Sequence, residues 1–548
     1  MKKILLALAT TFSITVYSQV FTSSNLPIVI LTTNNNQAIP SEPKINGTMK
    51  IIYNGPGVRN YVTDPANNYN GNIGIEKRGA YSSSLPQKPY SIELRDAQLL
   101  QKDTVILGMD PEHDWLLIAN YNDKAFMRNT LPYKLSRKMD HWDAHSKFCE
   151  VTLNGNYQGI YLLMESLKRD SNRVSIADLD TNENAGIDVT GGYIIKNDYW
   201  NAGNSWLSNF HPIDHPNYNV HLVYHQPNPL NITAQQKTYI QTFINDFETA
   251  LYSPNFADSL TGYQKYMDVN SFVDYLIINE LARNNDGFKK SSYFHKDKDK
   301  LTHISKLKAG PVWDFDWAWK DIPAGGCIFD ATDGSGWAHH INDCGPDVNS
   351  PGWFVRLLQD TNFQNVFRCH WEKYRTTILD TNYLFSYIDS NVVYLNEAQQ
   401  RHYAKWGHMG QATGTPEVQP PASSFAQEIY NWKAWIWRRI VWLDANIPGH
   451  AVNCDFTAIA EQTSVGSNIT VFPNPANNIL TIQSTSLLKN NRIEIADITG
   501  KVMINYNFTN TSNSDKIDIS GLSDGIYIYS IYNNNNILCK PGKLVILH

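Results

Sequence analysis

Two aspartates lie two residues apart within an aromatic run, the segment 310–320 with the sequence GPVWDFDWAWK. These residues, Asp314 and Asp316, directly follow a stretch that reads as a β-strand. Carboxylate oxygens are the hard ligands that Mg²⁺ prefers in proteins. The pattern therefore predicts a divalent metal site, although a structural cap or a Ca²⁺ site would use the same two residues.

A third aspartate, Asp286, follows a predicted helix over residues 268–283, with Asn285 immediately before it. A carboxylate in this position can serve as a general base, but an aspartate after a helix is often only a solvated turn residue. Asp286 taken alone does not decide between the two, so the order of the surrounding elements matters.

The first half of the chain is β-rich. Strands are predicted where apolar residues alternate or run between turn residues, over 26–33, 47–54, 72–79 and 88–96. A helix is predicted over 123–139, with Asn122 or Asp123 as its N-cap. A hairpin over 147–165 then turns at an Asn-Gly pair, a strong hairpin signal.

The second half is helical, with helices predicted over 234–253, 268–283 and 425–447. A β-rich lobe ahead of an α-rich lobe indicates an α+β, bilobal architecture.

The order of elements is that of a protein-kinase N-lobe. A strand leads into the small-residue loop 78–87 (RGAYSSSLPQ), and the next strand opens at Lys88. A helix, a hairpin and an apolar strand ending at Met164 and Glu165 follow. In kinases such a loop lets backbone N–H groups approach phosphates, the strand lysine pairs with them, and the last strand leads into a hinge that holds the base.

Six segments of the chain resemble the CotH family of atypical, spore-coat-type protein kinases: 78–94, 114–129, 159–176, 190–198, 279–299 and 307–319. The resemblance spans about residues 26–447 and keeps the order of the motifs. It implies an atypical protein-kinase-like fold with a β-rich N-lobe and an α-rich C-lobe. It also implies transfer of the ATP γ-phosphate to hydroxyl groups of a surface or secreted protein, with Mg²⁺ or alternatively Mn²⁺.

The resemblance assigns roles to individual residues. Asp314 and Asp316 would hold the metal, Asp286 would accept the proton of the acceptor hydroxyl, and Asn285 would help to position it. The nucleotide would be bound by Arg78, Ser83, Lys88, Met164, Glu165 and Lys168. The alternatives are ordinary structural roles: a surface lysine at Lys88, a salt bridge within the lobe at Arg78, a strand end at 164–165 and a solvated charge at Lys168.

One position departs from the pattern of ordinary kinases. The residue five places beyond Asp286 is Ser291 instead of an asparagine, and a serine hydroxyl is the weaker metal ligand. Two alternatives therefore remain: a non-catalytic cell-surface binding or structural protein on a kinase-like scaffold, and ATP-dependent transfer of a group other than phosphate.

Both ends of the chain carry export signals. Residues 1–18 combine two lysines with a short apolar run and small residues before Gln19, as in a secretory signal peptide. Residues 471–548 form a predicted all-β sandwich with the segments 471–482 (VFPNPANNILTI), 493–502 (IEIADITGKV) and 518–531 (DISGLSDGIYIYSI). These segments resemble the C-terminal sorting domain of the type IX secretion system, and an ordinary carbohydrate-binding β-module is the alternative. The predicted organisation is a signal peptide over 1–18, a kinase-like domain over 19–455, a linker over 456–470 and a sorting domain over 471–548.

The sorting resemblance implies contact with the type IX secretion machinery and a location at the cell surface or outside the cell. No later apolar run is long enough to predict a transmembrane anchor. The formal net charge of −6 and the absence of a long basic run argue against nucleic acid as a partner. Of the six cysteines, Cys327 and Cys344 bracket a Gly- and Asp-rich loop, so they are predicted to form a disulfide, with two unpaired thiols as the alternative.

Overall fold

A computed structural model describes residues 21–548 except 322–326, 414–416, 419–420, 453, 455–468, 475, 485–487, 490, 498–500, 510–511, 534–535, 538–541 and 547. Contacts divide the chain into two compact units, Met1–Cys454 and Asp455–His548. The predicted signal peptide and nearly all of the predicted linker lie outside the described residues. No helix among the described residues is long and apolar enough to cross a membrane.

The larger unit contains a closed seven-stranded barrel with the strand order β10-β11-β9-β6-β5-β3-β2. Its strands are β2 (Ile28–Thr33), β3 (Ile45–Ile52), β5 (Tyr69–Lys77), β6 (Tyr90–Arg95), β9 (Asp114–Ala119), β10 (Ser146–Leu153) and β11 (Asn156–Glu165). The predicted strands and hairpin are all present. The parallel pairing of β10 with β2 closes the barrel. This long-range contact cannot be predicted from a local sequence pattern.

Strand β11 is buried on both faces because it belongs to two cores. Leu163 points into the barrel, where it packs with residues such as Trp115. Its neighbours in the strand, Leu162 and Met164, point outward and join the core of the helices. Successive side chains of a strand alternate between its faces, so a continuous apolar run can serve two cores at once.

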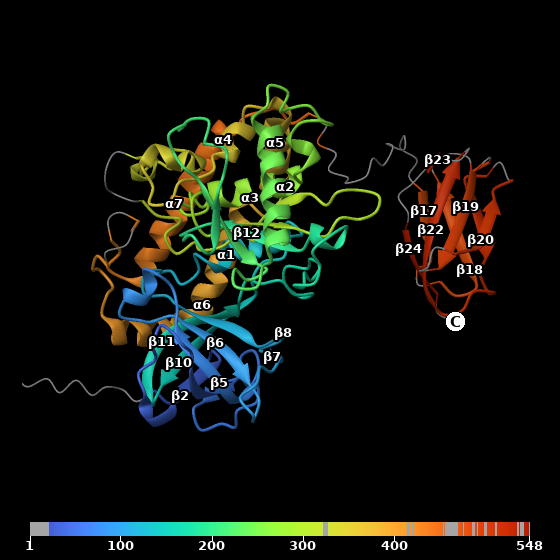
Figure 1. Ribbon diagram of the computed structural model, residues 1–548. Coiled ribbons are helices and arrows are strands. Elements are labelled where there is room, and N and C mark those ends of the chain that lie inside the picture. Colours follow the sequence, from blue (N-terminus) through green and yellow to red (C-terminus); the bar gives the residue numbers. More distant parts are fainter. Residues whose placement is uncertain are drawn as a thin grey trace, which may run out of the picture. The chain divides into compact units, whose positions relative to one another are not determined.

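A second sheet has the order β13-β14-β12-β15-β16. Its strands are β12 (Tyr193–Asn197), β13 (Ser205–Leu207), β14 (His221–Gln226), β15 (Ser292–Lys296) and β16 (Leu307–Ala309). The helices are α1 (Thr130–Lys138), α2 (Ala234–Tyr252), α3 (Val269–Leu281), α4 (Trp353–Leu357), α5 (Thr361–Arg375), α6 (Thr381–Trp406) and α7 (Phe425–Asn446). In Figure 1 the barrel strands gather at the lower end of this unit and α2 to α5 at the upper end. Two short ribbons, β1 (Ser23–Ser24) with β4 (Asn60–Tyr61) and β7 (Thr104–Ile106) with β8 (Met109–Glu112), complete it.

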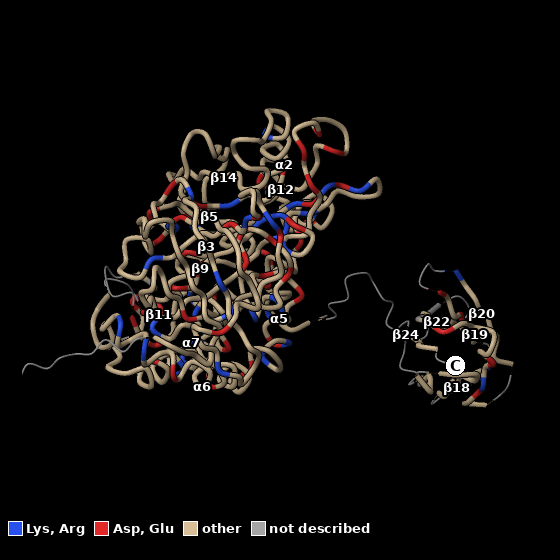
Figure 2. Tube along the Cα trace, turned by 90° about the horizontal axis from the view of Figure 1, so that it is seen from below, with Lys and Arg blue, Asp and Glu red and all other residues tan. Residues whose placement is uncertain are grey.

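The unit is mixed α+β, as predicted, and acidic and basic residues are interspersed along it (Figure 2). One predicted helix is wrong in its first half, since α1 begins at Thr130 instead of residue 123. The carboxylate of Asp123 accepts hydrogen bonds from the backbone N of Ala125 and Arg128 at 3.1 and 2.8 Å, and Phe126 has a φ of 65°. These contacts fix a compact buried loop in place of two helical turns.

The smaller unit is all-β, with two sheets that share one apolar core. One sheet contains β17 (Ile469–Phe472), β18 (Ile479–Ser484) and β21 (Ser514–Asp518). The other contains β19 (Asn491–Asp497), β20 (Val502–Asn507), β22 (Gly525–Asn533), β23 (Asn536–Ile537) and β24 (Gly542–Ile546).

Two disulfides stabilise the larger unit. Cys327 and Cys344 are bonded, with Cα atoms 5.4 Å apart, which confirms the predicted pair. A second bond joins Cys369 in α5 to Cys454, with Cα atoms 5.3 Å apart, and ties the end of this unit to its core. The sequence analysis missed the second bond because its cysteines are 85 residues apart.

Replacing Cys369 and Cys454 by alanine is expected to lower the free energy of unfolding by about 4–5 kcal/mol, because a bridge across 85 residues restricts the unfolded chain over a long loop. Replacing Cys327 and Cys344, only 17 residues apart, should cost about 3 kcal/mol. Urea unfolding followed by tryptophan fluorescence compares the two double variants. A larger loss from the shorter bridge would contradict this ranking.

Candidate active site

A cavity of about 610 Å³ opens between the barrel and the second sheet of the larger unit. The loop after β5 (78–82), the ends of β9 and β11, the loop after α3 (285–291) and the loop after β16 (313–317) contribute to its wall. Six of the residues predicted from the sequence line it: Arg78, Met164, Asn285, Asp286, Asp314 and Asp316. The fold thus gathers residues that are up to 238 positions apart in the chain, from 78 to 316.

Strand register explains why several of these loops meet. In the second sheet Asn197 pairs with Ser292, and Phe294 pairs with Ala309. Because β15 is antiparallel to both of its neighbours, the end of β12, the beginning of β15 and the end of β16 lie at one edge. Loops that leave this edge carry the polar groups of the cavity.

Asp286 follows the C-terminal end of α3, which several hydrogen bonds hold in place. The buried Glu280 carboxylate accepts hydrogen bonds from the backbone N of His339 at 2.8 Å and from Nη2 of Arg439 in α7 at 2.9 Å. One turn later the buried Arg283 donates from Nη2 to Oδ1 of Asp321 at 3.0 Å. These charge-assisted hydrogen bonds hold the last turn of α3 against α7 and its surroundings, so the loop that follows starts from a fixed position.

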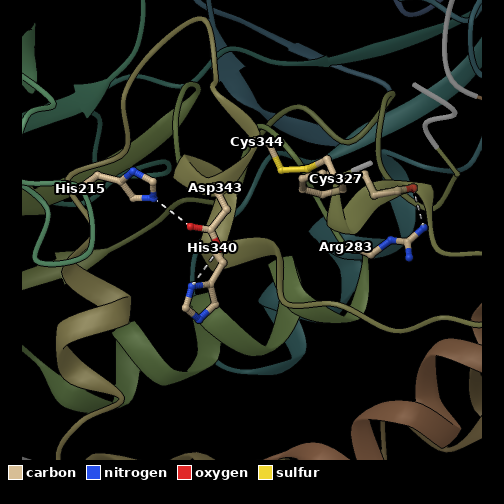
Figure 3. Close-up of a disulfide and its surroundings, with 7 residues drawn as sticks. His215, Arg283, Cys327, His340, Asp343 and Cys344 are labelled. Carbon is tan, nitrogen blue, oxygen red and sulfur yellow. Dashed lines mark hydrogen bonds and ion pairs between the residues drawn. A yellow bond between two sulfur atoms is a disulfide. The ribbon is translucent and has the colours of Figure 1, made fainter. Parts of the chain in front are cut away.

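The Cys327–Cys344 disulfide lies beside this anchor, in the close-up that also shows Arg283 (Figure 3). It joins the 3₁₀ helix Ile328–Asp330 to the 3₁₀ helix Ala338–Cys344, whose first residues bind Glu280. Figure 3 also shows the pair of His215 Nε2 and Asp343 Oδ1, 2.8 Å apart. The bond therefore supports the segment on which the end of α3 rests.

The loop that carries Asp314 and Asp316 is held by side chains from α1, from its N-cap and from the segment that follows α3. Asp314 has a φ of 62°, a left-handed conformation that few non-glycine residues adopt. The backbone N of Phe315 donates to Oδ1 of Asn129 at 2.7 Å, and Asn284 Nδ2 donates to the carbonyl of Asp314 at 3.3 Å. The backbone N of Asp314 donates to the Tyr133 hydroxyl at 3.4 Å. Surrounding contacts thus maintain an unfavourable backbone conformation, which is typical of functional sites.

Three of the aspartates in the cavity wall, Asp286, Asp314 and Asp316, repel one another. Burial, followed by the charges of Asp316 and Asp286, raises the pKa of Asp314 well above its ordinary value. Burial raises the pKa of Asp286 to about 6, although the ammonium groups of Lys290 and Lys289 oppose the shift. A divalent cation would remove the repulsion, since it adds positive charge where negative charge is concentrated.

Basic groups face the carboxylates. The Nζ atoms of Lys289 and Lys290 lie 3.5 and 3.6 Å from Oδ1 of Asp286. Both also contact Asp347, whose Oδ2 accepts a hydrogen bond from the Tyr199 hydroxyl at 2.6 Å. The Arg78 guanidinium forms no hydrogen bond or ion pair with any described residue, which leaves it available to a ligand.

Buried polar atoms that have no hydrogen-bond partner indicate what kind of ligand would fit the cavity. Oδ1 of Asn285, Oδ1 of Asp286 and Oδ1 of Asn122 are buried, and none of them has a hydrogen-bond partner among the described residues. Asn122 also donates from Nδ2 to Oδ2 of Asp316 at 2.6 Å, so its free oxygen lies beside the carboxylates. The unpartnered amide oxygens of Asn285 and Asn122, together with the carboxylates, are hard oxygen ligands, and the residues therefore fit a divalent metal.

Two nucleotide-binding predictions fall outside the cavity wall. Ser83 and Lys88 do not line it, although the neighbouring Ser82 does. Nζ of Lys88 donates to the backbone carbonyls of Ser83 and Ser84 at 3.0 and 3.3 Å. The lysine braces the small-residue loop from behind instead of pointing at the cavity. Spacing alone does not show this position of the lysine, because it depends on the direction in which the loop folds back.

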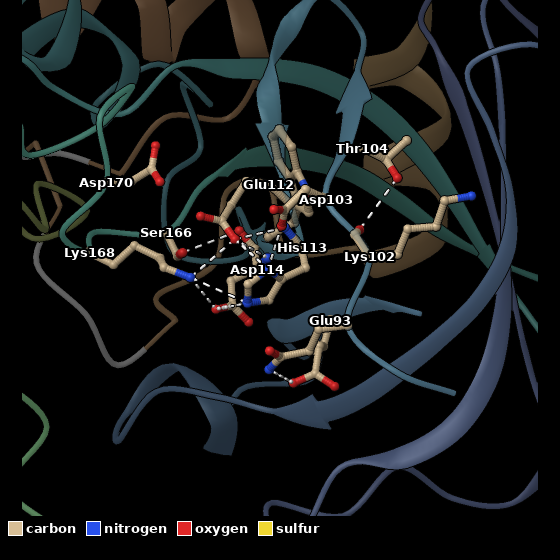
Figure 4. Close-up of polar contacts among 12 residues, drawn as sticks. Glu93, Lys102, Asp103, Thr104, Glu112, His113, Asp114, Ser166, Lys168 and Asp170 are labelled. Atoms are coloured by element: carbon tan, nitrogen blue, oxygen red, sulfur yellow. Dashed lines mark hydrogen bonds and ion pairs between the residues drawn. The ribbon is translucent and has the colours of Figure 1, made fainter. Parts of the chain in front are cut away.

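Glu165 and Lys168 are also outside the wall. The buried Glu165 carboxylate accepts hydrogen bonds from the backbone N and the ring of His145 at 2.8 and 3.1 Å. Nζ of Lys168 lies 3.1 Å from Glu112 and 2.9 Å from Asp114, in the polar cluster of Figure 4. These carboxylates neutralise the charge of Lys168, and the ion pairs connect the segment after β11 to residues 112–114 at the start of β9.

The cavity contains polar residues that the sequence analysis did not assign, namely Asn129, Lys196, Asp198, Tyr199, Lys289, Lys290 and Asp347. Lys289 and Lys290 had a local signal, since they follow Asp286 within one turn of chain. Ser291 lines the cavity as well, and its Oγ lies 3.4 Å from Oδ2 of Asp314. Ser291, at the sequence position where ordinary kinases have an asparagine, thus places a hydroxyl beside Asp314.

The family model described as CotH kinase protein matches residues 75–443, more than half of the chain. The chain belongs to the CotH family. The matched span contains every residue of the cavity wall, so the cavity is a feature of the CotH domain. Membership implies, in general, the use of ATP and a metal.

A second family model, the secretion system C-terminal sorting domain, matches residues 470–546 and implies export to the cell surface or beyond. A solved structure of PorZ, a surface component of the type IX secretion system of Porphyromonas gingivalis, aligns at 17% identity with a TM-score of 0.12. That alignment covers 15% of this chain and 12% of PorZ, too little to support a structural conclusion. No curated protein gives a significant match.

Replacing Asp314 with asparagine is expected to stabilise the metal-free CotH domain at pH 8 by about 2–4 °C in its unfolding midpoint. Folding raises the pKa of this carboxyl, so its ionisation destabilises the native state increasingly as the pH rises above the ordinary value of 3.8. The gain should shrink toward pH 4. Thermal unfolding at both pH values, with and without Mg²⁺ or Mn²⁺, provides the measurement.

The same variant should lose the stabilisation that the metal gives to the wild type. Asp110→Asn, which removes an exposed carboxylate outside the cavity, is the control and should behave as wild type. A metal response that persists in full in Asp314→Asn would show that the cation binds elsewhere.

Proposed function

We propose that this protein is an exported atypical kinase that transfers the γ-phosphate of ATP to hydroxyl groups of a surface or secreted protein. The observation that carries the proposal is the convergence of Asp286, Asp314 and Asp316 with basic side chains in one cavity of a CotH domain. Phosphoryl transfer depends on metal, positive charge and positioning more than on covalent chemistry, and this cavity offers residues for each.

The wall of the cavity supports nucleotide binding. Its apolar part, formed by Pro89, Ile118, Ala119 and Met164, offers a surface for the adenine ring. Its polar part is supplied by the loop 78–82 and by the lysines beside Asp286. A volume of about 610 Å³ lies within the range of roughly 300–1,000 Å³ that is usual for ligand pockets.

The same distribution of residues supports a kinase-like arrangement of two lobes. One side of the cavity comes from the barrel and its loop 78–82, and the other comes from the loops after α3 and β16. In this proposal the barrel takes the place of the N-lobe, and the helices with the second sheet take that of the C-lobe. A nucleotide would then lie between the lobes, as in other kinases.

The roles of the carboxylates follow from their surroundings. Asp286 would accept the proton of the acceptor hydroxyl as its oxygen bonds to the γ-phosphorus and the bond to ADP breaks. Its pKa of about 6 leaves it ionised at neutral pH, close to the value that suits a general base. Asp314 and Asp316 would hold the metal, with Asn122 orienting Asp316. Bound Mg²⁺ would neutralise charge on the phosphates.

Asp286→Ala and Asp314→Ala are expected to separate turnover from binding. Asp286→Ala should slow transfer about 10²–10⁴-fold with nucleotide affinity nearly unchanged, because a base acts mainly in the transition state. Asp314→Ala should lose transfer and metal-dependent ATP binding together, because the metal loses its anchoring charge. Transfer of label from γ-labelled ATP to a generic protein acceptor, measured beside calorimetric binding, tests both variants.

Asp110→Ala, which removes an exposed carboxylate, is the matched control and should retain both functions. A parallel assay with α-labelled ATP identifies transfer of AMP, the alternative in which a group other than phosphate moves. Metal-dependent ATP binding without transfer of either label would favour a non-catalytic binding protein. Full activity in Asp286→Ala would refute its role as the base.

We propose that the sorting tail passes the protein to the type IX secretion machinery after a signal peptide over 1–18 has directed it across the inner membrane. Deleting residues 471–548 should leave a folded, ATP-binding CotH domain that stays in the periplasm, because each unit has its own core. Cell fractionation with nucleotide binding by the retained protein is the measurement. Normal surface delivery of the truncated chain would contradict the assignment.

A further inference from the structure

A second cavity of the larger unit, of about 310 Å³, also borders α1, and it shares no wall residue with the candidate active site. We call it the basic cavity. Lys134 and Arg137 of α1 and Lys147 of β10 contribute to its wall, and no acidic residue does. The rest of the wall is largely aromatic or apolar and includes Tyr53, Phe148, Tyr387 and Tyr394.

Two of the three cations in this cavity have no anionic partner among the described residues. The ammonium groups of Lys134 and Lys147 form no ion pair with any described residue. Nζ of Lys134 lies 4.5 Å from the ring centre of Tyr387, over its face. Burial, then the charges of Lys138 and Arg137, lower the pKa of Lys134. The neighbouring cations repel this ammonium, and an anion would relieve the repulsion.

Arg137 is held in place without losing its charge. Its Nη1 donates to the backbone carbonyls of Asp143 and Ala144 at 3.3 and 2.7 Å. The side chain of Asp143 also attracts the guanidinium, but it is buried outside the wall and its pKa is raised to about 7 by burial. The guanidinium is therefore a positioned donor, whereas the two lysines can adjust to a ligand.

We infer that the basic cavity binds a phosphate monoester whose carrier is an aromatic or apolar group. A phosphate monoester has close to two negative charges at neutral pH, which suits a wall with three cations and no carboxylate. The tyrosine and phenylalanine rings offer contact area for the carrier. The binding site itself does not depend on the proposed kinase activity.

Its consequence for turnover does rest on the proposed function. Helix α1 and its N-cap hold the metal-site loop through Asn129 and Tyr133, which contact Phe315 and Asp314. Thr130, in the first turn of α1, accepts a hydrogen bond from the Tyr387 hydroxyl at 2.8 Å. A ligand between Lys134 and Tyr387 would therefore contact the helix that positions the catalytic loop, and occupancy would change the rate of transfer.

Calorimetric titration of the mature protein with phenyl phosphate tests the site, without nucleotide. Phenol, which has the ring but no charge, should not bind. Lys134→Gln and Lys147→Gln should each weaken binding about tenfold or more, because each removes a charge-assisted contact. Lys102→Gln, which removes an exposed charge outside the wall, is the matched control and should bind as wild type.

The candidate active site also contains basic side chains, so its contribution must be separated. Binding should persist in the double variant Lys289→Gln, Lys290→Gln. If it is lost there and retained in Lys134→Gln, the phosphate occupies the candidate active site and the inference is overturned. Equal binding by all variants, or none by the wild type, would overturn it as well. Because no nucleotide is present, failure of phosphoryl transfer would leave this result unaffected.

A short peptide that contains phosphotyrosine distinguishes the source of the ligand. Tighter binding of the peptide than of phenyl phosphate would assign the site to a modified polypeptide, and equal binding would assign it to a small ester. Both outcomes support a phosphate site. Unfolding midpoints of Lys134→Gln and Lys147→Gln that match the wild type would show that a loss of binding is not a loss of fold.

Discussion

The mutual repulsion of Asp286, Asp314 and Asp316 is the constraint on which the rest of the larger unit depends. Three carboxyl groups in one buried cavity destabilise the native state unless protons or cations compensate them, and burial raises the pKa of both Asp286 and Asp314. A protein keeps such a cluster only where other contacts fix its geometry. The repulsion within the cluster therefore explains why many hydrogen bonds and ion pairs hold its loops. It also explains why a bound metal ion would stabilise the fold as well as take part in the proposed reaction.

The bracing comes from buried charged pairs. Arg128, at the centre of one, lies between Asp123 and Glu428 at 2.8 Å from each and fixes the loop that leads into α1. Arg439 contacts Glu280 at the end of α3 in the same way. Such pairs contribute little net stability compared with apolar packing, but they specify one arrangement because an unpaired buried charge is costly. Here they specify the positions from which the site loops start.

Helix α1 connects the two cavities. Tyr133 lines the candidate active site, and Lys134 and Arg137, one and four residues later, line the basic cavity. A helix of nine residues is short and depends on tertiary packing for its stability. Its position can therefore respond to what lies on either side, which gives the proposed anion site a physical route to the metal-site loop.

The sequence by itself predicted six of the seven barrel strands, the hairpin among them, and the helices α2, α3, α7 and part of α1, because each has a local pattern of apolar residues and turn signals. The sorting tail and the grouping of Asp286, Asp314 and Asp316 were predicted only with the help of family resemblance. It could not determine which way a side chain points once the chain folds. Lys88 lies at the predicted strand start yet turns back to hold Ser83, and Lys168 is taken up by Glu112 and Asp114. Likewise, contacts between distant segments bring Lys290 to Asp347. They also bring Cys369 to Cys454. Local patterns fix elements, but the partners of a charge are decided by tertiary packing.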